Sequence, residues 1–326
     1  MSNLNIKPKV LVSHQWPPEI LSRLKEHCQV KVLGSDSFTT QEEFLKALPG
    51  ADAVIIIPSI TIDNKVLDIA GPQLKVIATA SAGLGHIDLN ECRRRGIKVG
   101  YVADTVTKAV AEMTISLMLA TARRLDEAMQ SVKTGAWGTK WDSALWMCGK
   151  QVSGSVIGIV GLGRIGLATA KRLSAFEPSR ILYSGNSVKP EAAKVRAEFV
   201  SFSELLETSD FVIATCSVHA RNQKLFNAEA FARMKKDSVF INVTRGALVD
   251  QDALYDALST HKIGAAGLDV TTPEPLPTDH KLLTLKNCLI TPHIASGTIE
   301  TRMAMCSLTV DNILAGLTDN PLPCPC

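Results

Sequence analysis

Residues 156–166 read Val156-Ile157-Gly158-Ile159-Val160-Gly161-Leu162-Gly163-Arg164-Ile165-Gly166, and they give the strongest indication of the fold. An apolar run typical of a buried strand breaks into the pattern G-x-G-x-x-G, and helix-forming sequence follows. In that context the first glycine allows a tight turn, the second lets the backbone approach a pyrophosphate, and the third lets the helix pack on the sheet. The flanking strand and helix disfavour a purely structural turn. We therefore predict a dinucleotide site made by Gly161, Leu162, Gly163, Arg164, Ile165 and Gly166.

The size and charge of the chain limit what it can be. At 326 residues it exceeds the usual size of a single hydrophobic core, so two domains are expected. Its 35 basic and 32 acidic residues nearly balance, and no basic block indicates nucleic acid. The eight cysteines show no zinc-ligand spacing, so we expect no metal and a reducing compartment. Without an apolar run of about 20 residues or a leader segment, we expect a soluble, cytoplasmic protein with no membrane partner.

The hydrophobic pattern predicts an α/β fold with two doubly wound parallel sheets. Before residue 107, β-branched runs alternate with amphipathic stretches, which is typical of βα units. No glycine-rich turn follows the first of these strands, so this half is expected to present substrate. After Gly166 the alternation resumes, and a final helix at residues 300–317 comes too late for the second sheet. We predict a discontinuous, flavodoxin-like substrate domain (residues 1–106 and 296–326) and a Rossmann dinucleotide-binding domain (residues 107–295).

Residues 135–149 form an unusual segment within the second of these domains. Trp137, Trp141 and Trp146 lie there, three of the four tryptophans in the chain. The segment is either an irregular loop folded on its own domain or an arm packed on a second subunit, because large aromatic side chains often anchor interfaces.

The end of the second strand after the glycine motif bears on the type of cofactor. NAD enzymes commonly place Asp or Glu there to bind the ribose hydroxyls, but Ile181-Leu182-Tyr183-Ser184-Gly185-Asn186-Ser187 contains no acid. Hydrogen-bonding groups and one positive charge stand in its place, on Ser184, Asn186, Ser187 and Lys189. The sequence therefore favours NADPH (NADP) over NAD(H), which stays possible.

Three residues follow predicted strands and could carry chemistry. Arg245 comes two residues after the predicted strand at residues 239–243, Glu274 stands between two prolines, and His293 follows Pro292. Each alone has an ordinary explanation, as a surface ion pair, a loop carboxylate or a capping histidine. Because parallel strands end at one edge of a sheet, we expect the three to lie together.

These three groups suit the reduction of a carbonyl. His293 can supply a proton, Glu274 can favour the charged imidazole, and Arg245 can grip a carboxylate and polarise the adjacent carbonyl. The turn Ser81-Ala82-Gly83-Leu84-Gly85 offers backbone amides for the carboxylate oxygens. We thus predict substrate contacts from Ala82, Gly83, Arg245 and His293.

With these motifs, the chain resembles the D-isomer-specific 2-hydroxyacid dehydrogenases over nearly its whole length, and within them the glyoxylate/hydroxypyruvate reductases. The resemblance implies that Arg245, Glu274 and His293 are the catalytic residues. It also implies a homodimer in which Trp141 of one subunit lines the substrate pocket of the other. It further places several residues near the nicotinamide half of the cofactor: Ser217, Val243, Asp269, Ala295 and Ser296.

Two positions depart from the pattern of the family. Gly85 stands where the family usually has an acid, and Asn186 stands where NADPH-preferring relatives tend to carry arginine. These departures bear on the rigidity of the substrate turn and on whether a preference for NADPH rests on Lys189.

The predicted function is the NADPH-dependent reduction of glyoxylate to glycolate and of hydroxypyruvate to D-glycerate, with His293 as proton donor. Two alternatives stay open. One is an NAD-linked dehydrogenase of another, bulkier or phosphorylated D-2-hydroxy acid. The other is a nucleotide-sensing corepressor of the same fold, which the lack of a long disordered tail disfavours.

Overall fold

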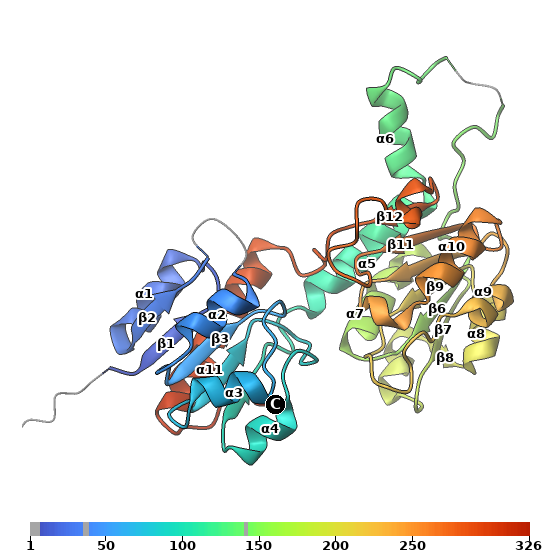
Figure 1. Ribbon diagram of the computed structural model, residues 1–326. Coiled ribbons are helices and arrows are strands. Elements are labelled where there is room, and N and C mark those ends of the chain that lie inside the picture. The colour runs from blue at the N-terminus through green and yellow to red at the C-terminus, as the bar shows by residue number, and fades with distance from the viewer. Residues whose placement is uncertain (1–6, 35–38, 140–142) are drawn as a thin grey trace, which may run out of the picture. The chain divides into compact units, whose positions relative to one another are not determined.

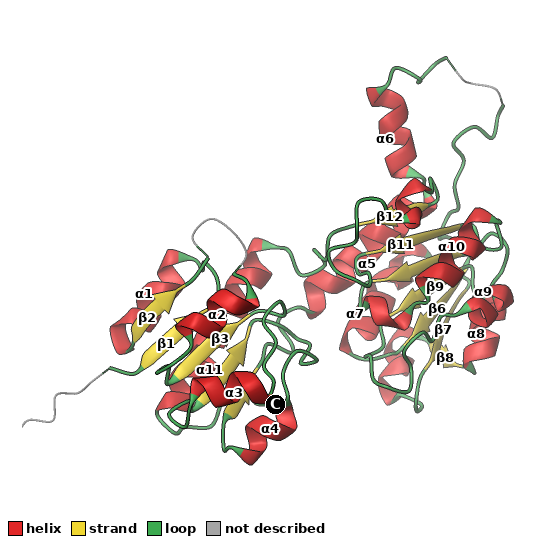
Figure 2. Cartoon of the chain, in the orientation of Figure 1, coloured by secondary structure: helices red, strands yellow, loops and turns green. Residues whose placement is uncertain are grey.

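The structure, a computed structural model, describes residues 7–34, 39–139 and 143–326. The chain divides into two compact units, Met1–Val106 with Gly297–Cys326, and Thr107–Ser296. Ser296 groups with the second unit, one residue beyond the boundary that we expected. Each unit contains its own parallel sheet covered by helices on both faces (Figures 1 and 2).

The first unit contains a five-stranded parallel sheet in the order β2-β1-β3-β4-β5. This is the flavodoxin-like order, as predicted. The helix α11 joins this unit and lies with α1 on one face of the sheet, while α2, α3 and α4 cover the other. The strands are β1 (Lys9–Val12), β2 (Gln29–Val32), β3 (Ala53–Ile56), β4 (Val76–Thr79) and β5 (Lys98–Gly100). The helices are α1 (Pro18–His27), α2 (Gln41–Ala47), α3 (Asn64–Ala70), α4 (Leu89–Arg94) and α11 (Ile299–Leu317).

Local sequence explains where these elements begin. Thr40 and Glu43 form a reciprocal capping box at the start of α2, and Asp63 caps α3 through the Val66 amide. The strands β3 and β4 are buried at every residue, as expected for parallel strands covered on both faces.

The second unit contains a seven-stranded parallel sheet in the order β12-β11-β10-β9-β6-β7-β8. The order reverses at β6, which lies between β7 and β9 and is followed by the glycine motif. One face packs against α5 and α7, and the other against α8, α9 and α10. The strands are β6 (Val156–Val160), β7 (Arg180–Ser184), β8 (Ala197–Phe199), β9 (Phe211–Ala214), β10 (Val239–Asn242), β11 (Ala265–Leu268) and β12 (Cys288–Ile290). The helices are α5 (Thr107–Ala122), α6 (Leu125–Lys133), α7 (Arg164–Leu173), α8 (Phe202–Thr208), α9 (Ala228–Arg233) and α10 (Gln251–Ser259). Short 3-10 turns are η1 (Ser174–Phe176), η2 (Pro190–Val195), η3 (Gly246–Leu248) and η4 (Lys281–Thr284).

Three elements had no counterpart in the sequence-based prediction. The strands β5 and β8 have three residues each, and a charged residue, Lys98 or Glu198, interrupts the apolar run in each of them. The helix α6 starts directly after α5, where Arg124 adopts a left-handed conformation with φ of 54°. That residue turns the chain, so the apolar α5 and the amphipathic α6 are separate helices.

The helix α6 extends away from the sheet of its unit (Figure 1). Ser131 is its only buried residue, while Leu125, Met129 and Val132 are exposed by 46, 56 and 60%. Trp137 is 67% exposed, so its side chain does not fold onto its own unit. Trp141 lies outside the described residues.

The described residues lack two kinds of feature. None of the helices there combines the length and the apolar character needed to cross a membrane. Within the same ranges, His, Cys, Asp and Glu side chains do not gather in threes as a metal site would require.

Candidate active site

The glycine turn after β6 depends on close backbone contacts. Gly161 has φ of 97°, and its amide donates to the Ser184 carbonyl of the neighbouring strand at 2.8 Å. A Cβ at this position would lie 2.6 Å from the Cα of Cys216. A side chain at Gly166 would collide with the Gly161 carbonyl, which also accepts from the Thr215 hydroxyl at 2.6 Å. Only glycine therefore fits at residues 161 and 166 without a steric clash.

Gly163 has the opposite environment, because no atom lies within 4 Å of where its Cβ would be. It is the N-cap of α7 and provides no side-chain cap. The first residues of that helix, Arg164 and Ile165, follow this open position at a helix N-terminus, whereas Leu162 is buried. Such a place suits a pyrophosphate, so the residues present fit a dinucleotide.

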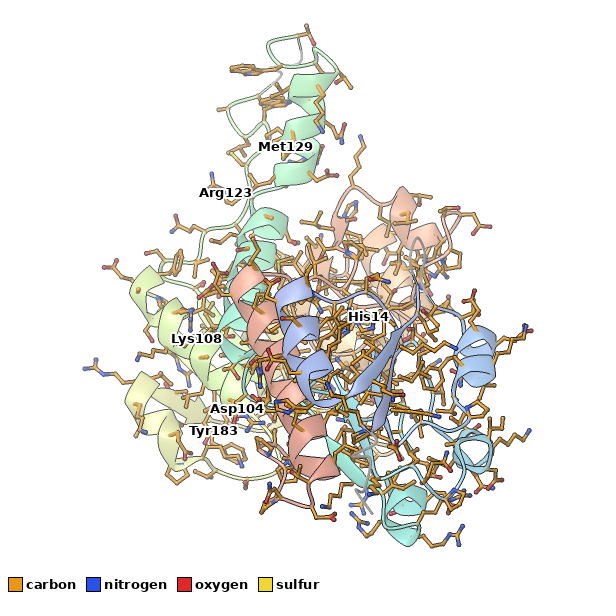
Figure 3. All side chains as sticks on the ribbon, turned by 90° about the vertical axis from the view of Figure 1, so that its left-hand side faces the viewer. His14, Asp104, Lys108, Arg123, Met129 and Tyr183 are labelled. Atoms are coloured by element: carbon orange, nitrogen blue, oxygen red, sulfur yellow. The ribbon has the colours of Figure 1, made fainter. Side chains whose placement is uncertain are left out.

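The loop after β7 is positioned by Tyr183, which the sequence analysis did not single out. The ring of Tyr183 is buried, and its hydroxyl accepts from the Lys189 amide at 2.8 Å (Tyr183 is labelled in Figure 3). Ser184 is buried at the end of the strand, while Asn186, Ser187 and Lys189 are exposed. A buried aromatic residue with a polar tip, one residue before the strand ends, was the available signal.

Arg245 follows β10 in a turn that Asn242 organises. The fully buried Asn242 side chain donates to the Arg245 carbonyl at 2.9 Å and accepts from the Thr244 amide at 3.0 Å. The next residue, Gly246, packs so closely on the Thr271 carbonyl that a Cβ would collide with it. The Arg245 turn is thereby held against the loop that carries Glu274.

Glu274 connects its own loop to the turn that carries His293. One carboxylate oxygen, Oε1, accepts from the Thr271 amide at 2.9 Å. The other, Oε2, lies 2.8 Å from the Nδ1 atom of His293. Because this bond uses Nδ1, proton exchange with a substrate falls to Nε2.

The turn that carries His293 rests on the fully buried carboxylate of Asp269. Asp269 accepts from the Thr291 hydroxyl at 2.6 Å and from the amides of Ile294 and Ala295 at 2.9 and 2.8 Å. His293 itself has φ of 53°, a left-handed conformation that these bonds hold in place. The resemblance placed Asp269 beside the nicotinamide, and the structure adds this positioning role.

The charges at this edge of the sheet act on one another. Burial raises the pKa of Glu274, but hydrogen bonds from His293 and the Thr271 amide outweigh it, so the pKa lies below the ordinary glutamate value. Burial lowers the pKa of Arg245, and the charge of Glu274 opposes this change. Since the guanidinium of arginine keeps its proton in proteins, Arg245 stays a cation. The Arg245 guanidinium thus lies beyond the carboxyl end of β10, the Glu274 carboxylate beyond that of β11, and the His293 imidazole beyond that of β12.

The other predicted residues lie as follows. Val243 and Ala295 are buried at strand ends of the same edge, Ser296 is half-buried, and Ser217 is exposed. The Ser217 carbonyl accepts from Asn222 at 2.8 Å, which closes the loop after β9.

Ala82 and Gly83 follow β4 in the first unit. The Gly83 amide donates to the Ser81 hydroxyl at 3.1 Å, so a carboxylate would have to compete with that bond. Around Gly85 no atom lies within 4 Å of where a Cβ would be.

Comparisons with known proteins match these observations. Residues 115–295 match the family model described as D-isomer specific 2-hydroxyacid dehydrogenase, NAD binding domain. The chain is 47% identical to glyoxylate reductase/hydroxypyruvate reductase of Homo sapiens, over 97% of this chain and 96% of the human protein. A solved structure of a protein from Thermus thermophilus has a TM-score of 0.90 at 39% identity, covering 97% of this chain and 99% of the other.

A second solved structure is that of an NADPH-dependent glyoxylate/hydroxypyruvate reductase from Sinorhizobium meliloti, in complex with NADP and malonate. It has a TM-score of 0.85 at 29% identity, covering 98% of this chain and 97% of the other. The family match covers more than half of the chain, and the human relative covers nearly all of it. The chain therefore belongs to the D-isomer-specific 2-hydroxyacid dehydrogenases, a family of oxidoreductases.

Proposed function

We propose that this protein reduces glyoxylate to glycolate and hydroxypyruvate to D-glycerate with NADPH. The observation that carries the proposal is the 2.8 Å pair of His293 and Glu274 beside Arg245, at the same sheet edge as the glycine turn. The human and bacterial relatives support it through their names, which are those of glyoxylate and hydroxypyruvate reductases.

Each residue of the site has a task in this reaction. With a dinucleotide held at the glycine turn, the hydride for this reduction would come from the nicotinamide. The Nε2 atom of His293 donates a proton to the oxygen that was the carbonyl, and the Glu274 carboxylate stabilises the imidazolium before that transfer. The guanidinium of Arg245 binds the substrate carboxylate and polarises the neighbouring carbonyl. The turn with Ala82 and Gly83 is proposed to contact the same carboxylate.

The test is the oxidation of NADPH by the purified protein with either keto acid. His293→Ala should lower kcat by about 10²- to 10⁴-fold, the usual contribution of general acid catalysis, while the Kd for NADPH changes little. His261→Ala is a matched control, because His261 is exposed and has the same φ of 53°. A near-normal rate for His293→Ala would remove this histidine from the mechanism.

The preference for NADPH is part of the proposal. The loop from Ser184 to Lys189 contains no acid that would repel a 2′-phosphate, and Lys189 provides a positive charge. Lys189→Ala should raise the KM for NADPH several-fold and leave that for NADH unchanged. Equal effects on both cofactors would show that Lys189 does not recognise the phosphate.

The two alternatives predict different outcomes in the same assays. A dehydrogenase of another D-2-hydroxy acid would show its highest kcat/KM with a bulkier or phosphorylated keto acid and with NADH. A corepressor would bind the dinucleotide and a peptide without turnover. A panel of keto acids with both cofactors distinguishes all three.

We also propose a homodimer built around α6. The exposed stripe of Leu125, Met129 and Val132 recurs at helical spacing, and a surface of this kind is typical of an interface. Met129→Glu should shift the mass measured by light scattering from dimer to monomer, whereas Gln130→Glu on the same helix should not. We also propose, from the family resemblance, that Trp141 of one subunit lines the substrate pocket of the other.

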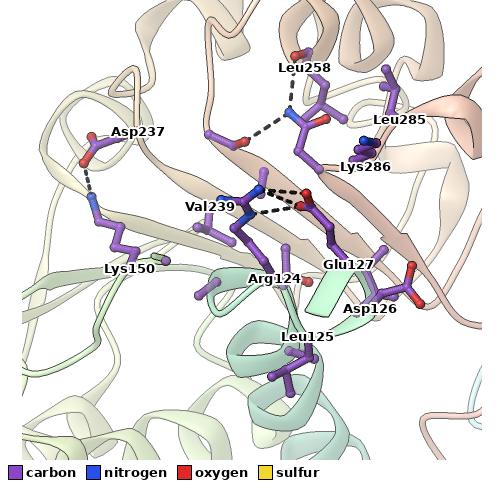
Figure 4. A pocket seen from close by; sticks show the side chains of 18 of the residues that line it. Arg124, Leu125, Asp126, Glu127, Lys150, Asp237, Val239, Leu258, Leu285 and Lys286 are labelled. Atoms are coloured by element: carbon purple, nitrogen blue, oxygen red, sulfur yellow. Dashed lines mark hydrogen bonds and ion pairs between the residues drawn. The ribbon is translucent and has the colours of Figure 1, made fainter. Parts of the chain in front are cut away.

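A cavity of about 890 Å³ lies beside α6 at the amino ends of β10 and β11, lined by Arg124, Lys150, Asp237 and Val239 among others (Figure 4). Arg124 pairs with Glu127 at 2.8 Å, and Lys150 pairs with Asp237 at 2.5 Å. The cavity is at the opposite edge of the sheet from His293, so we do not take it as the substrate site. Its position beside the apolar stripe supports a role in the interface.

We propose a cytoplasmic location, because all eight cysteines are described and all are free thiols. Free thiols on this scale are typical of a reducing compartment. Fractionation of cells that make the protein tests this.

A further inference from the structure

The segment from Leu322 to Cys326 extends the sheet of the first unit. Pro325 forms an antiparallel bridge with Gly100 of the edge strand β5. The Tyr101 amide donates to the Cys324 carbonyl at 3.1 Å, and the Cys326 amide donates to the Val99 carbonyl at 3.0 Å. The segment thereby covers an edge that would otherwise present unpaired backbone groups.

Asn312 of α11 completes this attachment. Its fully buried side chain accepts from the Cys324 amide at 2.9 Å and donates to the Tyr101 carbonyl at 3.2 Å. The Asn312 amide group thus makes one donated and one accepted hydrogen bond to the backbone, as a peptide group of a neighbouring strand would. A Cβ on Gly100 would lie 2.6 Å from the Asn312 side chain, so glycine is needed there.

The register of this bridge determines which way Cys326 points. Side chains alternate along a strand, and Gly100 faces Asn312 on the α11 side. Val99 and Cys326, which lie opposite each other, therefore face the α4 side. On that side Val99 packs in the same core cluster as Cys92 of α4, and the Cys92 carbonyl accepts from the Ile97 amide at 2.9 Å. Cys92 and Cys326 line one cavity of about 500 Å³.

The two thiols differ in exposure and in reactivity. Cys92 is 1% exposed, and burial, together with the nearby charges of Asp88 and Glu91, raises its pKa to about 11. It stays a protonated thiol that reacts poorly with small oxidants. Cys326 is exposed to solvent, so an oxidant reaches it first.

We infer that Cys326 and Cys92 form a reversible disulfide that fastens the segment from Leu322 to Cys326 to α4 when the protein meets a peroxide. The thiol of Cys326 takes one oxygen from hydrogen peroxide, which gives a sulfenic acid and releases one water. The sulfur of Cys92 then attacks the Cys326 sulfur, and its proton leaves with the hydroxyl group as a second water. Two thiols are oxidised and one peroxide is reduced, and a thiol reductant reverses the bond.

This inference does not depend on the reductase activity. The disulfide would close a long loop of chain, and long loops gain the most from a cross-link because the unfolded state is restricted. Reduction in the cell would keep the bond transient.

Peptide mapping of the full chain under non-reducing conditions tests the inference. After treatment with hydrogen peroxide, we expect a linked pair of peptides containing Cys92 and Cys326 that separates on addition of dithiothreitol. Cys326→Ser should abolish the pair, and Cys324→Ser should keep it. A link between Cys324 and Cys326, or a sulfinic or sulfonic acid at Cys326 beside a free Cys92 thiol, would overturn the inference.

Thermal unfolding provides a second measurement that does not require substitution of the buried cysteine. The oxidised wild-type protein should unfold several degrees above the reduced protein, and the difference should vanish in Cys326→Ser. Basal activity should be unchanged in that variant, because the cysteine lies outside the proposed active site. An unchanged midpoint after complete linkage would show that the bond does not fasten the segment.

Discussion

The Nδ1 atom of His293 lies 2.8 Å from Oε2 of Glu274, and Glu274 is fixed in turn by the Thr271 amide at 2.9 Å. The histidine is thus oriented by a carboxylate that is itself held by backbone. Such support keeps a proton donor within reach of its substrate.

Glu274→Gln should lower kcat by about 10- to 100-fold, because a neutral amide no longer stabilises the imidazolium. The KM for NADPH should change little. Since the pKa of Glu274 lies below its ordinary value, Glu274 should stay a carboxylate throughout the pH range in which an ordinary glutamate is ionised, so the wild-type kcat should not lose its support there. Steady-state rates across pH test both points, and an unchanged kcat in the variant would contradict the role of Glu274.

Asp269→Asn should lower stability by about 1 to 3 kcal/mol, the usual cost of leaving a buried group unsatisfied. The asparagine amide would face the Ile294 or Ala295 amide, donor against donor. Because the turn with His293 loosens, kcat should fall as well. Urea unfolding and rates measure the two effects, with exposed Asp279→Asn as the control. Full stability in Asp269→Asn would show that these bonds matter little.

Gly246→Ala should destabilise the protein by about 1 to 3 kcal/mol, because its new methyl group collides with the Thr271 carbonyl. The Arg245 turn and the Glu274 loop must move apart, which lowers kcat/KM. Gly185→Ala is the control for stability, since no atom lies within 4 Å of its Cβ position. Equal unfolding midpoints for the two variants would contradict the close contact.

Tyr183→Phe should raise the KM for NADPH several-fold with kcat nearly unchanged. The ring still fills its buried place, but the Lys189 amide loses its acceptor, so the loop that we propose for the 2′-phosphate is less ordered. Tyr255→Phe on α10 is the matched control. A fall in kcat alone would indicate a different role for the hydroxyl.

Stability should rise with pH between about 4 and 6.5 because of His14 in the first unit. Burial, then the charge of Arg302, lowers its pKa from 6.5 to about 4, and its Nε2 accepts from Trp16 at 3.0 Å (His14 is labelled in Figure 3). The unfolded state therefore binds the proton more readily, and stabilisation that is complete above pH 6.5 is lost as the pH falls towards 4.

The size of this effect follows from the shift, which corresponds to at most about 3 kcal/mol. His14→Gln should flatten the dependence in unfolding experiments at several pH values. An unchanged slope in the variant would assign the effect to other groups.

Much of the candidate site could be predicted from the sequence because its signals are local. The glycine turn needs glycine at Gly161 and Gly166 for reasons that any strand-turn-helix unit imposes. Arg245, Glu274 and His293 each follow a strand, and the parallel order of a doubly wound sheet brings strand ends together. The short strands β5 and β8 and the helix α6 escaped prediction, because a charged residue interrupts the apolar run in each strand and because α6 leaves its apolar side chains exposed.

The fold class, the family and the identity of the residues that we propose for catalysis follow from hydrophobic period and from motifs, which are properties of the chain alone. The groups that hold those residues in place depend on how the elements pack. The Asp269 carboxylate accepts a hydrogen bond from the Ala295 amide, and Gly246 packs against the Thr271 carbonyl. Both contacts join segments that lie far apart in the chain. The meeting of Cys326 with Val99 likewise depends on the register of a bridge to β5. Such contacts arise from packing between elements, and no local pattern of residues encodes the partner.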